Sequence, residues 1–210
     1  MKKVSIIDYG IGNILSVRRA FEKQKAEVEF ISSAEALMRA EKLVLPGVGA
    51  FRDGMKELEK RNLVFAIKEY CRSNRPFLGI CLGMQMMMDE SEEFGQNQGL
   101  GIIPGKVVKI EDTSLDGAFH KIPHVGWNEL SFAGNIENTI LDEIPERSSV
   151  YFVHSYKAVP EDDKHMLAGT YYGGRKLSAV IRKGNCYGTQ FHPEKSSKIG
   201  LKIIYNFMKI

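Results

Sequence analysis

The sequence predicts an α/β fold, a mixed sheet whose N-terminal half is parallel with helices on both faces and whose C-terminal strands are antiparallel. Two observations carry this expectation. Short apolar runs alternate with amphipathic stretches through the first half, and from residue 102 onward strands follow one another through glycine-containing turns. The first pattern is typical of βαβ units and the second of hairpins. Because composition does not break along the 210 residues, we expect a single domain, 1–210.

The parallel half rests on four apolar runs and the helical stretches between them. Strands are expected at 4–8, 28–31 and 43–45, with a fourth that ends at Cys81. Helices are expected at 13–25, from 32 onward, at 51–59, at 63–73 and in the methionine-rich stretch 84–88. Ser32 and Glu35 have the spacing of a capping box, which predicts where the second helix begins.

The antiparallel half rests on β-branched and aromatic runs bounded by turn residues. Strands are expected at 107–110, 150–159, 167–172, 177–181 and 187–191. Glycines at 173–174 and 184 predict hairpin turns, and 196–208 has the pattern of a closing helix.

Composition excludes several classes of function. With 29 basic and 26 acidic residues and no basic run, the chain lacks the charge pattern of a nucleic-acid-binding protein. The three cysteines are odd in number and not closely spaced, which argues against a disulfide framework and fits a reducing compartment. Neither a signal peptide nor a membrane span is apparent, so we expect a cytoplasmic protein.

Cofactor and metal motifs are also missing. Gly10-Ile11-Gly12 follows the first strand, but Leu15 stands where a dinucleotide fingerprint needs its third glycine. No phosphate-loop Gly-Lys-Ser/Thr occurs, and the five histidines lack metal-ligand spacing. We therefore expect no cofactor and no metal.

Cys81 is the candidate nucleophile. It stands where an apolar strand turns into a helix, with Gly79 and Gly83 on either side. Such a turn lifts a side chain clear of the sheet, the flanking glycines leave room for a substrate, and the helix N-terminus favours a thiolate. The competing interpretation is a small buried residue that ends a core strand.

His192 and Glu194 are the candidate base and its orienting group. A cysteine nucleophile needs both, and they can be distant in sequence. Pro193 biases His192 towards an extended backbone, in which residues two apart face the same way, so the carboxylate can hold one imidazole nitrogen. A strand-end histidine beside a surface glutamate is the alternative. His154 is a rival base, but its apolar surroundings favour a packed or substrate-lining role.

A glycine loop at 46–49 follows the third expected strand. Loops at this edge of a parallel sheet surround the ligand crevice. Its amides, together with the amide of Leu82, could hold the oxyanion formed when Cys81 attacks a carbonyl. An ordinary strand-to-helix turn is the alternative.

These motifs together resemble the class I glutamine amidotransferases. The family's Gly-x-Cys-x-Gly turn matches residues 79–83, and its His-x-Glu pair matches residues 192–194. More narrowly, the chain is similar over almost its full length to the glutaminase subunits of imidazole glycerol phosphate synthases. The matching blocks are residues 8–13, 46–51, 79–85, 124–128, 151–156 and 188–197. The resemblance implies a flavodoxin-like amidotransferase fold.

The resemblance also implies roles for individual residues. Cys81 would attack the glutamine amide, His192 would protonate the leaving ammonia and then activate water, and Glu194 would orient His192. The oxyanion would rest on the Val48 and Leu82 amides, after the Gly47-Val48 peptide reorients when a partner binds. The implied substrate-binding residues are Gly49, Gln85, Glu93, Ser155 and Tyr156.

The implied partner is a separate (β/α)8-barrel cyclase, which forms a heterodimer with the chain and uses the ammonia to make imidazole glycerol phosphate and a carboxamide ribotide (AICAR) in histidine biosynthesis. Asn13, Trp127 and Lys195 would lie at the shared interface, although Trp127 is equally compatible with a core position. Two alternatives remain. One is a second-copy subunit that feeds ammonia into surface-sugar amidination, and the other is a stand-alone cysteine amidase or peptidase.

Overall fold

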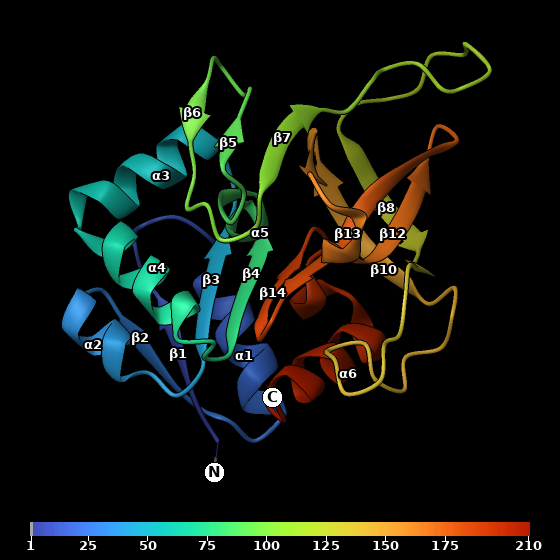
Figure 1. Cartoon of the computed structure of the whole chain (residues 1–210). Helices are drawn as coiled ribbons and strands as arrows, with labels where there is room; N and C mark the ends of the chain where they lie inside the picture. The colour runs from blue at the N-terminus through green and yellow to red at the C-terminus, as the bar shows by residue number, and fades with distance from the viewer. Residues whose placement is uncertain (1) are drawn as a thin grey trace.

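A large mixed sheet forms the centre of the computed structural model, which describes residues 2–210 (Figure 1). Its strand order is β2-β1-β3-β4-β14-β13-β12-β9. The strands are β1 (Lys3–Ile7), β2 (Glu27–Ile31), β3 (Leu43–Gly47), β4 (Phe77–Cys81), β9 (Ser131–Phe132), β12 (Met166–Tyr172), β13 (Arg175–Lys183) and β14 (Cys186–Thr189). Pairing is parallel from β2 through β4 to β14 and antiparallel from β14 to β9, which confirms the predicted fold class.

Helices cover both faces of this sheet. On one face lie α2 (Ala34–Arg39), α3 (Phe51–Lys60), α4 (Leu63–Arg72) and α5 (Leu82–Met86), and on the other α1 (Ile14–Lys23) and α6 (Ser197–Phe207). Helix α1 buries Val17, Ala20 and Phe21, which share one helical face. Each face therefore has its own apolar core, and the strands between them are buried on both sides.

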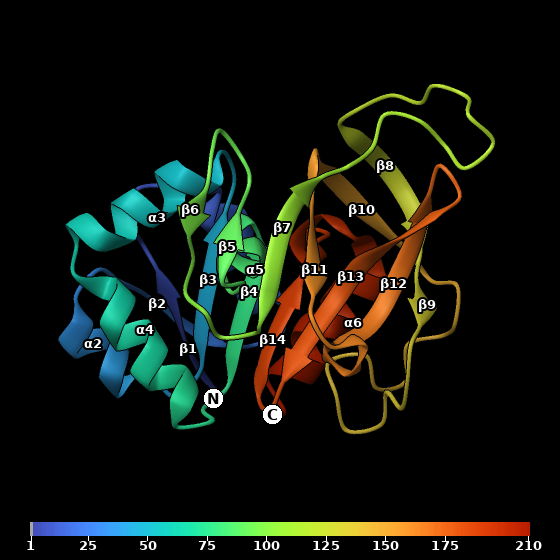
Figure 2. The ribbon, with the colours of Figure 1, turned by 45° about the horizontal axis from the view of Figure 1, so that its top comes forward.

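Two smaller sheets complete the fold. One pairs β8 (His124–Glu129) with β10 (Ser149–His154), and the other has the order β11-β7-β5-β6. The second sheet contains β5 (Glu90–Ser91), β6 (Asn97–Gln98), β7 (Gly105–Lys109) and β11 (Tyr156–Pro160). Figure 2 shows β7 crossing in front of the junction between β4 and β14, and in Figure 1 the arrows of β3 and β4 point towards α5 and β5. The four-stranded small sheet thus lies near the carboxyl ends of the parallel strands.

The structure corrects the single strand expected at 150–159. Strand β10 ends at His154 and β11 begins at Tyr156, and the two pair with different partners. At the break, His154 Nδ1 donates a hydrogen bond to the Tyr156 carbonyl at 2.8 Å. This hydrogen bond stabilises the bend between β10 and β11, which the apolar sequence around His154 does not indicate.

Other boundaries also differ from the expectation, and α5 spans Leu82–Met86 where a helix was expected at 84–88. Ser33, not Ser32, caps α2, because its hydroxyl accepts the Ala36 N–H at 3.3 Å. The strand expected at 187–191 ends at Thr189, and the short helix η2 (Pro193–Lys195) follows it. Among residues 2–210, no helix combines the length and apolar character needed to cross a membrane.

Candidate active site

Cys81 occupies a strained turn between β4 and α5. Its backbone has φ 54° and ψ −107°, a conformation that L-residues rarely adopt, and α5 begins at the next residue. Strain of this kind persists only where surrounding structure enforces it, and it is common at functional sites. The cysteine is mostly buried, with 7% of its surface exposed, so it ends a core strand and also lines a cavity.

The flanking glycines have a different role from the one expected. A Cβ on Gly83 would lie 1.9 Å from the Leu45 carbonyl oxygen of β3, and a Cβ on Gly79 would lie 2.7 Å from the Gly83 carbonyl carbon. These positions are filled by the protein backbone, so the glycines do not leave room for a substrate. They allow α5 to pack directly on the strands.

His192 and Glu194 form the predicted pair. His192 Nδ1 and Glu194 Oε1 are 2.8 Å apart, and both side chains are almost fully buried. The other ring nitrogen, Nε2, is buried without a nitrogen or oxygen partner. Burial lowers the pKa of His192, but the neighbouring Cys81 thiol and the hydrogen-bonded Glu194 carboxylate outweigh it and raise the pKa to about 9. The ring is therefore held between the thiol and the carboxylate.

The backbone that forms this pair is only partly extended. His192 has φ −96° and ψ 98°, as expected before proline, but Glu194 lies in the 3-10 helix η2. The His192 N–H donates to the Tyr151 carbonyl at 3.0 Å, and its carbonyl accepts the Ser196 hydroxyl at 2.7 Å. A helical turn, and not strand alternation, brings the carboxylate to the imidazole.

His154 does not have the geometry of a base for Cys81. Its Nδ1 bonds to the Tyr156 carbonyl at 2.8 Å and its Nε2 to His124 Nδ1 at 3.1 Å, so both nitrogens are occupied. Burial is the main cause that lowers the pKa of His154 to about 3, and the ring stays neutral. It lines the cavity beside Cys81, in agreement with the substrate-lining interpretation.

Gln190 is a site residue that sequence reasoning missed. Its fully buried amide nitrogen lies 3.8 Å from Cys81 Sγ, and its oxygen accepts a hydrogen bond from Gln85 Nε2 at 3.1 Å. Gln190 stands two positions before His192, so shared facing along an extended chain was the signal that could have found it.

The glycine loop adjoins the thiol. Gly47, the last residue of β3, is opposite Cys81 in the β3–β4 register. The Tyr9 hydroxyl donates to the Pro46 carbonyl at 2.8 Å and holds the start of the loop, whereas Val48 and Gly49 are exposed. Gly49 has φ 111°, which favours glycine.

A cavity of about 390 Å³ brings most of the predicted site residues together. Those that line it are Val48, Gly49, Cys81, Leu82, Gln85, Glu93, Ser155, Tyr156 and His192. Pro123, Val153 and His154 also contribute to its walls. Gly47 and Glu194 do not line the cavity, but each adjoins a residue that does, because Gly47 precedes Val48 and Glu194 is paired with His192.

Gln85 and Glu93 both present acceptors to this cavity. Gln85 Nε2 donates to Tyr156 O and to Gln190 Oε1, each at 3.1 Å, so its oxygen is the atom left for a ligand. Glu93 Oε2 accepts the Phe51 N–H at 2.6 Å. Burial raises the pKa of Glu93, partly offset by that hydrogen bond. An amide oxygen and a carboxylate suit a ligand that carries an ammonium group.

Asn13, Trp127 and Lys195 lie outside the cavity. All three are exposed, and Trp127 has 55% of its surface accessible, so it is not a core residue. Their elements form a continuous series, because α1 packs beside η2, η2 beside β10, and β10 pairs with β8. Among residues 2–210, the structure contains no group of three or more His, Cys, Asp or Glu residues arranged to hold a metal ion.

A cysteine, a histidine and a carboxylate grouped around one cavity of an α/β fold are typical of enzymes with a cysteine nucleophile, and comparison with known proteins identifies the family. Residues 5–210 match the family described as "Glutamine amidotransferase class-I". The chain therefore belongs to the class I glutamine amidotransferases and, within them, to the HisH subunits of imidazole glycerol phosphate synthase.

The relatives that support this assignment match end to end. The chain is 55% identical to imidazole glycerol phosphate synthase subunit HisH 1 of Legionella pneumophila (strain Lens), with 100% of both chains covered. It is 46% identical to subunit HisH of Geobacter sulfurreducens, covering 99% of this chain and 98% of the relative. Among solved structures, PurLQS from Thermotoga maritima matches with a TM-score of 0.75 at 18% identity, over 100% of this chain and 99% of that chain. That last likeness concerns the fold alone.

Proposed function

We propose that the chain hydrolyses glutamine to glutamate and ammonia and supplies the ammonia to a cyclase subunit of imidazole glycerol phosphate synthase. The observation that carries the proposal is the His192–Glu194 pair at 2.8 Å beside the strained Cys81 turn, within a cavity of about 390 Å³. The full-length similarity to HisH subunits supports the biosynthetic setting.

The chemistry follows from the protonation of His192. With a pKa of about 9, the imidazole is positively charged at neutral pH and stabilises a negative sulfur on Cys81. The sulfur attacks the glutamine amide carbon, and the imidazolium gives its proton to the departing nitrogen as ammonia leaves. The neutral ring then takes a proton from water, which hydrolyses the glutamyl thioester. Glu194 keeps Nδ1 as a donor throughout, so that Nε2 serves the reaction.

Substrate orientation follows from the acceptors in the cavity. The Gln85 oxygen and the Glu93 carboxylate suit the α-ammonium group of glutamine. Gly49 and the Ser155-Tyr156 segment line the same cavity and would bound the amino-acid backbone. Their positions leave the side-chain amide to extend towards Cys81.

The oxyanion would be held by backbone amides. Leu82 N–H lies at the start of α5, where the helix dipole favours negative charge. Val48 N–H would be the second donor once the exposed 47–48 peptide reorients. We propose that binding of a (β/α)8-barrel cyclase through the surface carrying Asn13, Trp127 and Lys195 drives this change.

The proposal is tested by measuring glutamate formation from glutamine with and without the cyclase subunit encoded by the same organism. We expect weak activity from the chain alone and a large increase with the cyclase. Turnover of simple amides or peptides, with no response to the cyclase, would instead support a stand-alone amidase. A cyclase partner from a sugar-modifying pathway that activates more strongly would assign the chain to surface-sugar amidination.

A further inference from the structure

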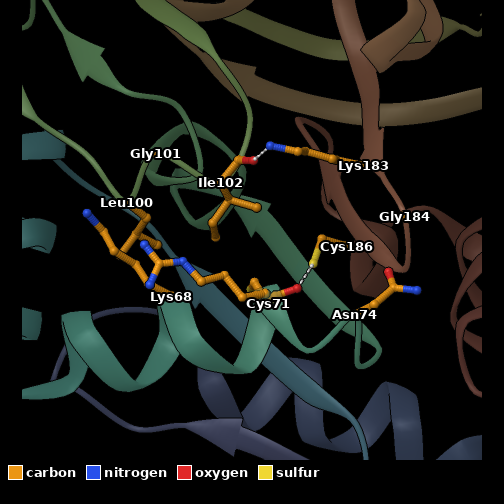
Figure 3. Close-up of a pocket in the computed structure, with 10 residues that line it drawn as sticks. Lys68, Cys71, Asn74, Leu100, Gly101, Ile102, Lys183, Gly184 and Cys186 are labelled. Carbon is orange, nitrogen blue, oxygen red and sulfur yellow. Dashed lines mark hydrogen bonds between the residues drawn. The ribbon is translucent and has the colours of Figure 1, made fainter.

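A second cavity, of about 370 Å³, lies at the other end of β4 from the candidate active site (Figure 3). Cys186, which lines it, pairs in register with Phe77 at the start of β4, whereas Cys81 ends that strand. Four residue steps along a strand span roughly 13 Å. The two sites are therefore separate, and nothing in the glutaminase chemistry uses the second one.

Two thiols meet in this second cavity. Cys71 lies near the end of α4 and is half-buried, and Cys186 is the first residue of β14 and is buried. Cys186 Sγ donates to the Cys71 carbonyl oxygen at 3.9 Å, the contact drawn in Figure 3. Each thiol also shifts the pKa of the other, upward for Cys71 and downward for Cys186. The structure thus brings together two cysteines that are 115 positions apart in sequence.

The charges around the pair are positive. Lys68 and Arg72 come from α4 and Lys183 from β13, and none of the cavity-lining residues is acidic. Lys183 Nζ is anchored to the Ile102 carbonyl at 2.8 Å, as Figure 3 shows. Two other titratable groups are nearby. Glu69 is paired with Arg72, and the Tyr70 hydroxyl is hydrogen-bonded to the Glu41 and Pro76 carbonyls.

The surroundings shift the pKa values of the two thiols in opposite directions. The hydrogen bond from Cys71 is the main cause that lowers the pKa of Cys186, with a smaller contribution from the charge of Lys183 and an opposing one from burial. The same hydrogen bond raises the pKa of Cys71. Cys186 is therefore the sulfur that ionises more readily, and we expect it to react first with an oxidant.

We propose that Cys71 and Cys186 are a reversible dithiol–disulfide pair oxidised by hydrogen peroxide or another small hydroperoxide. The Cys186 thiolate attacks the peroxide oxygen, which breaks the O–O bond, forms a sulfenic acid and releases hydroxide. The Cys71 sulfur then attacks the Cys186 sulfur, water leaves with the Cys71 proton, and the S–S bond forms. Sulfur supplies the two electrons that reduce the peroxide. Hydrogen peroxide is close in size to water, which occupies about 30 Å³, so the cavity admits it readily.

The experiment maps the cysteines after limited oxidation of the full chain. Reduced protein is treated with a small excess of hydrogen peroxide, quenched with catalase, denatured, alkylated and digested without reductant. We expect one species in which the Cys71 and Cys186 peptides are joined within a single chain, lighter by two hydrogens and restored to three free thiols by dithiothreitol.

Variants identify the roles of the two sulfurs. In Cys71→Ser the cross-link is lost, and a dimedone adduct at Cys186 traps the sulfenic acid. In Cys186→Ser, Cys71 stays alkylatable as a thiol. Lys183→Gln slows cross-linking by roughly fivefold because it removes a positive charge beside the thiolate. Lys176→Gln, an exposed position on the same strand, is the matched control and leaves the rate unchanged.

Two results would overturn the proposal. One is retention of both Cys71 and Cys186 as alkylatable thiols while Cys81 is oxidised. The other is a cross-link that joins separate chains or that forms equally fast in Lys183→Gln. The wild-type peptide map decides the first point even if a variant fails to fold, and it does not depend on whether Cys81 acts as the glutaminase nucleophile.

Discussion

At the scale of single residues, His192 is the group whose protonation determines the charge available to Cys81 in the candidate site. Its buried ring carries a raised pKa because a thiol and a carboxylate lie on either side of it. Sequence spacing predicted this pair, because few residue types can serve a cysteine nucleophile. It did not predict Gln190, because an amide has no reactivity of its own and the two-residue spacing from His192 did not by itself indicate contacts with Gln85 and Cys81.

The raised pKa of His192 predicts how stability depends on pH. The folded-state pKa of about 9 exceeds the ordinary value of 6.5, so the folded chain binds this proton more tightly than the unfolded chain. The stabilisation, at most about 3 kcal/mol, is complete below about pH 6.5 and is lost as the pH rises through about 9. Urea unfolding between pH 6 and 10 should therefore show a steeper decline for the wild type than for Glu194→Gln. Identical pH dependence in the two proteins would contradict the assignment.

Gln190 should affect the reactivity of Cys81. Gln190→Glu keeps the shape but loses the N–H donated towards sulfur and adds a negative charge, so we expect thiol alkylation and glutamine turnover to fall by about tenfold or more. Gln190→Leu should also lose the partner of Gln85. The pH profile of iodoacetamide modification at Cys81 is the measurement, since a purely structural role would leave its midpoint unchanged.

At the scale of elements, the site depends on close packing of α5 against β3 and β4. The parallel half was predictable because strands buried on both faces give continuous apolar runs and their helices give amphipathic ones. Strand β8 was not predictable in the same way. Its apolar Val125 and Trp127 face solvent, so its alternation does not indicate a buried face. The break between β10 and β11 was missed because it depends on a side-chain hydrogen bond of His154.

Gly83 provides the test of this packing. An added Cβ would lie 1.9 Å from the Leu45 carbonyl, so Gly83→Ala must push α5 away from β3. We expect a loss of about 3 kcal/mol or more in the free energy of unfolding, together with loss of glutaminase activity. Gly134→Ala is the matched control, because a Cβ there meets nothing within 4 Å. Equal urea midpoints for the two variants would refute the argument.

At the scale of the whole molecule, the candidate site is linked to an exposed surface that the proposed function assigns to a partner. Trp127 is exposed and contacts Tyr151 edge-on, with ring centroids 6.1 Å apart, and the Tyr151 carbonyl holds the His192 N–H. A partner that contacts Trp127 would thus be linked to His192 through Trp127 and Tyr151. The sequence could not fix this link, because it depends on the pairing of β8 with β10.

Trp127 should be an anchor for the cyclase. Trp127→Ala is expected to weaken binding by about 2 kcal/mol or more, roughly thirtyfold in Kd, because exposed tryptophans often dominate interfaces. Phe65→Ala is the control, since Phe65 is exposed on α4, a different part of the surface. Calorimetric titration with the cyclase measures both. Equal Kd values for the two variants would show that Trp127 does not anchor the cyclase.

The central claim is that Cys81 is the nucleophile for glutamine. Its most direct test is glutamate formation by the complex with the cyclase, compared between Cys81→Ser and Cys71→Ser, which removes a thiol outside the candidate active site. The account predicts that Cys81→Ser loses glutaminase activity by at least about 10³-fold while Cys71→Ser retains it. Wild-type activity in Cys81→Ser would contradict the account.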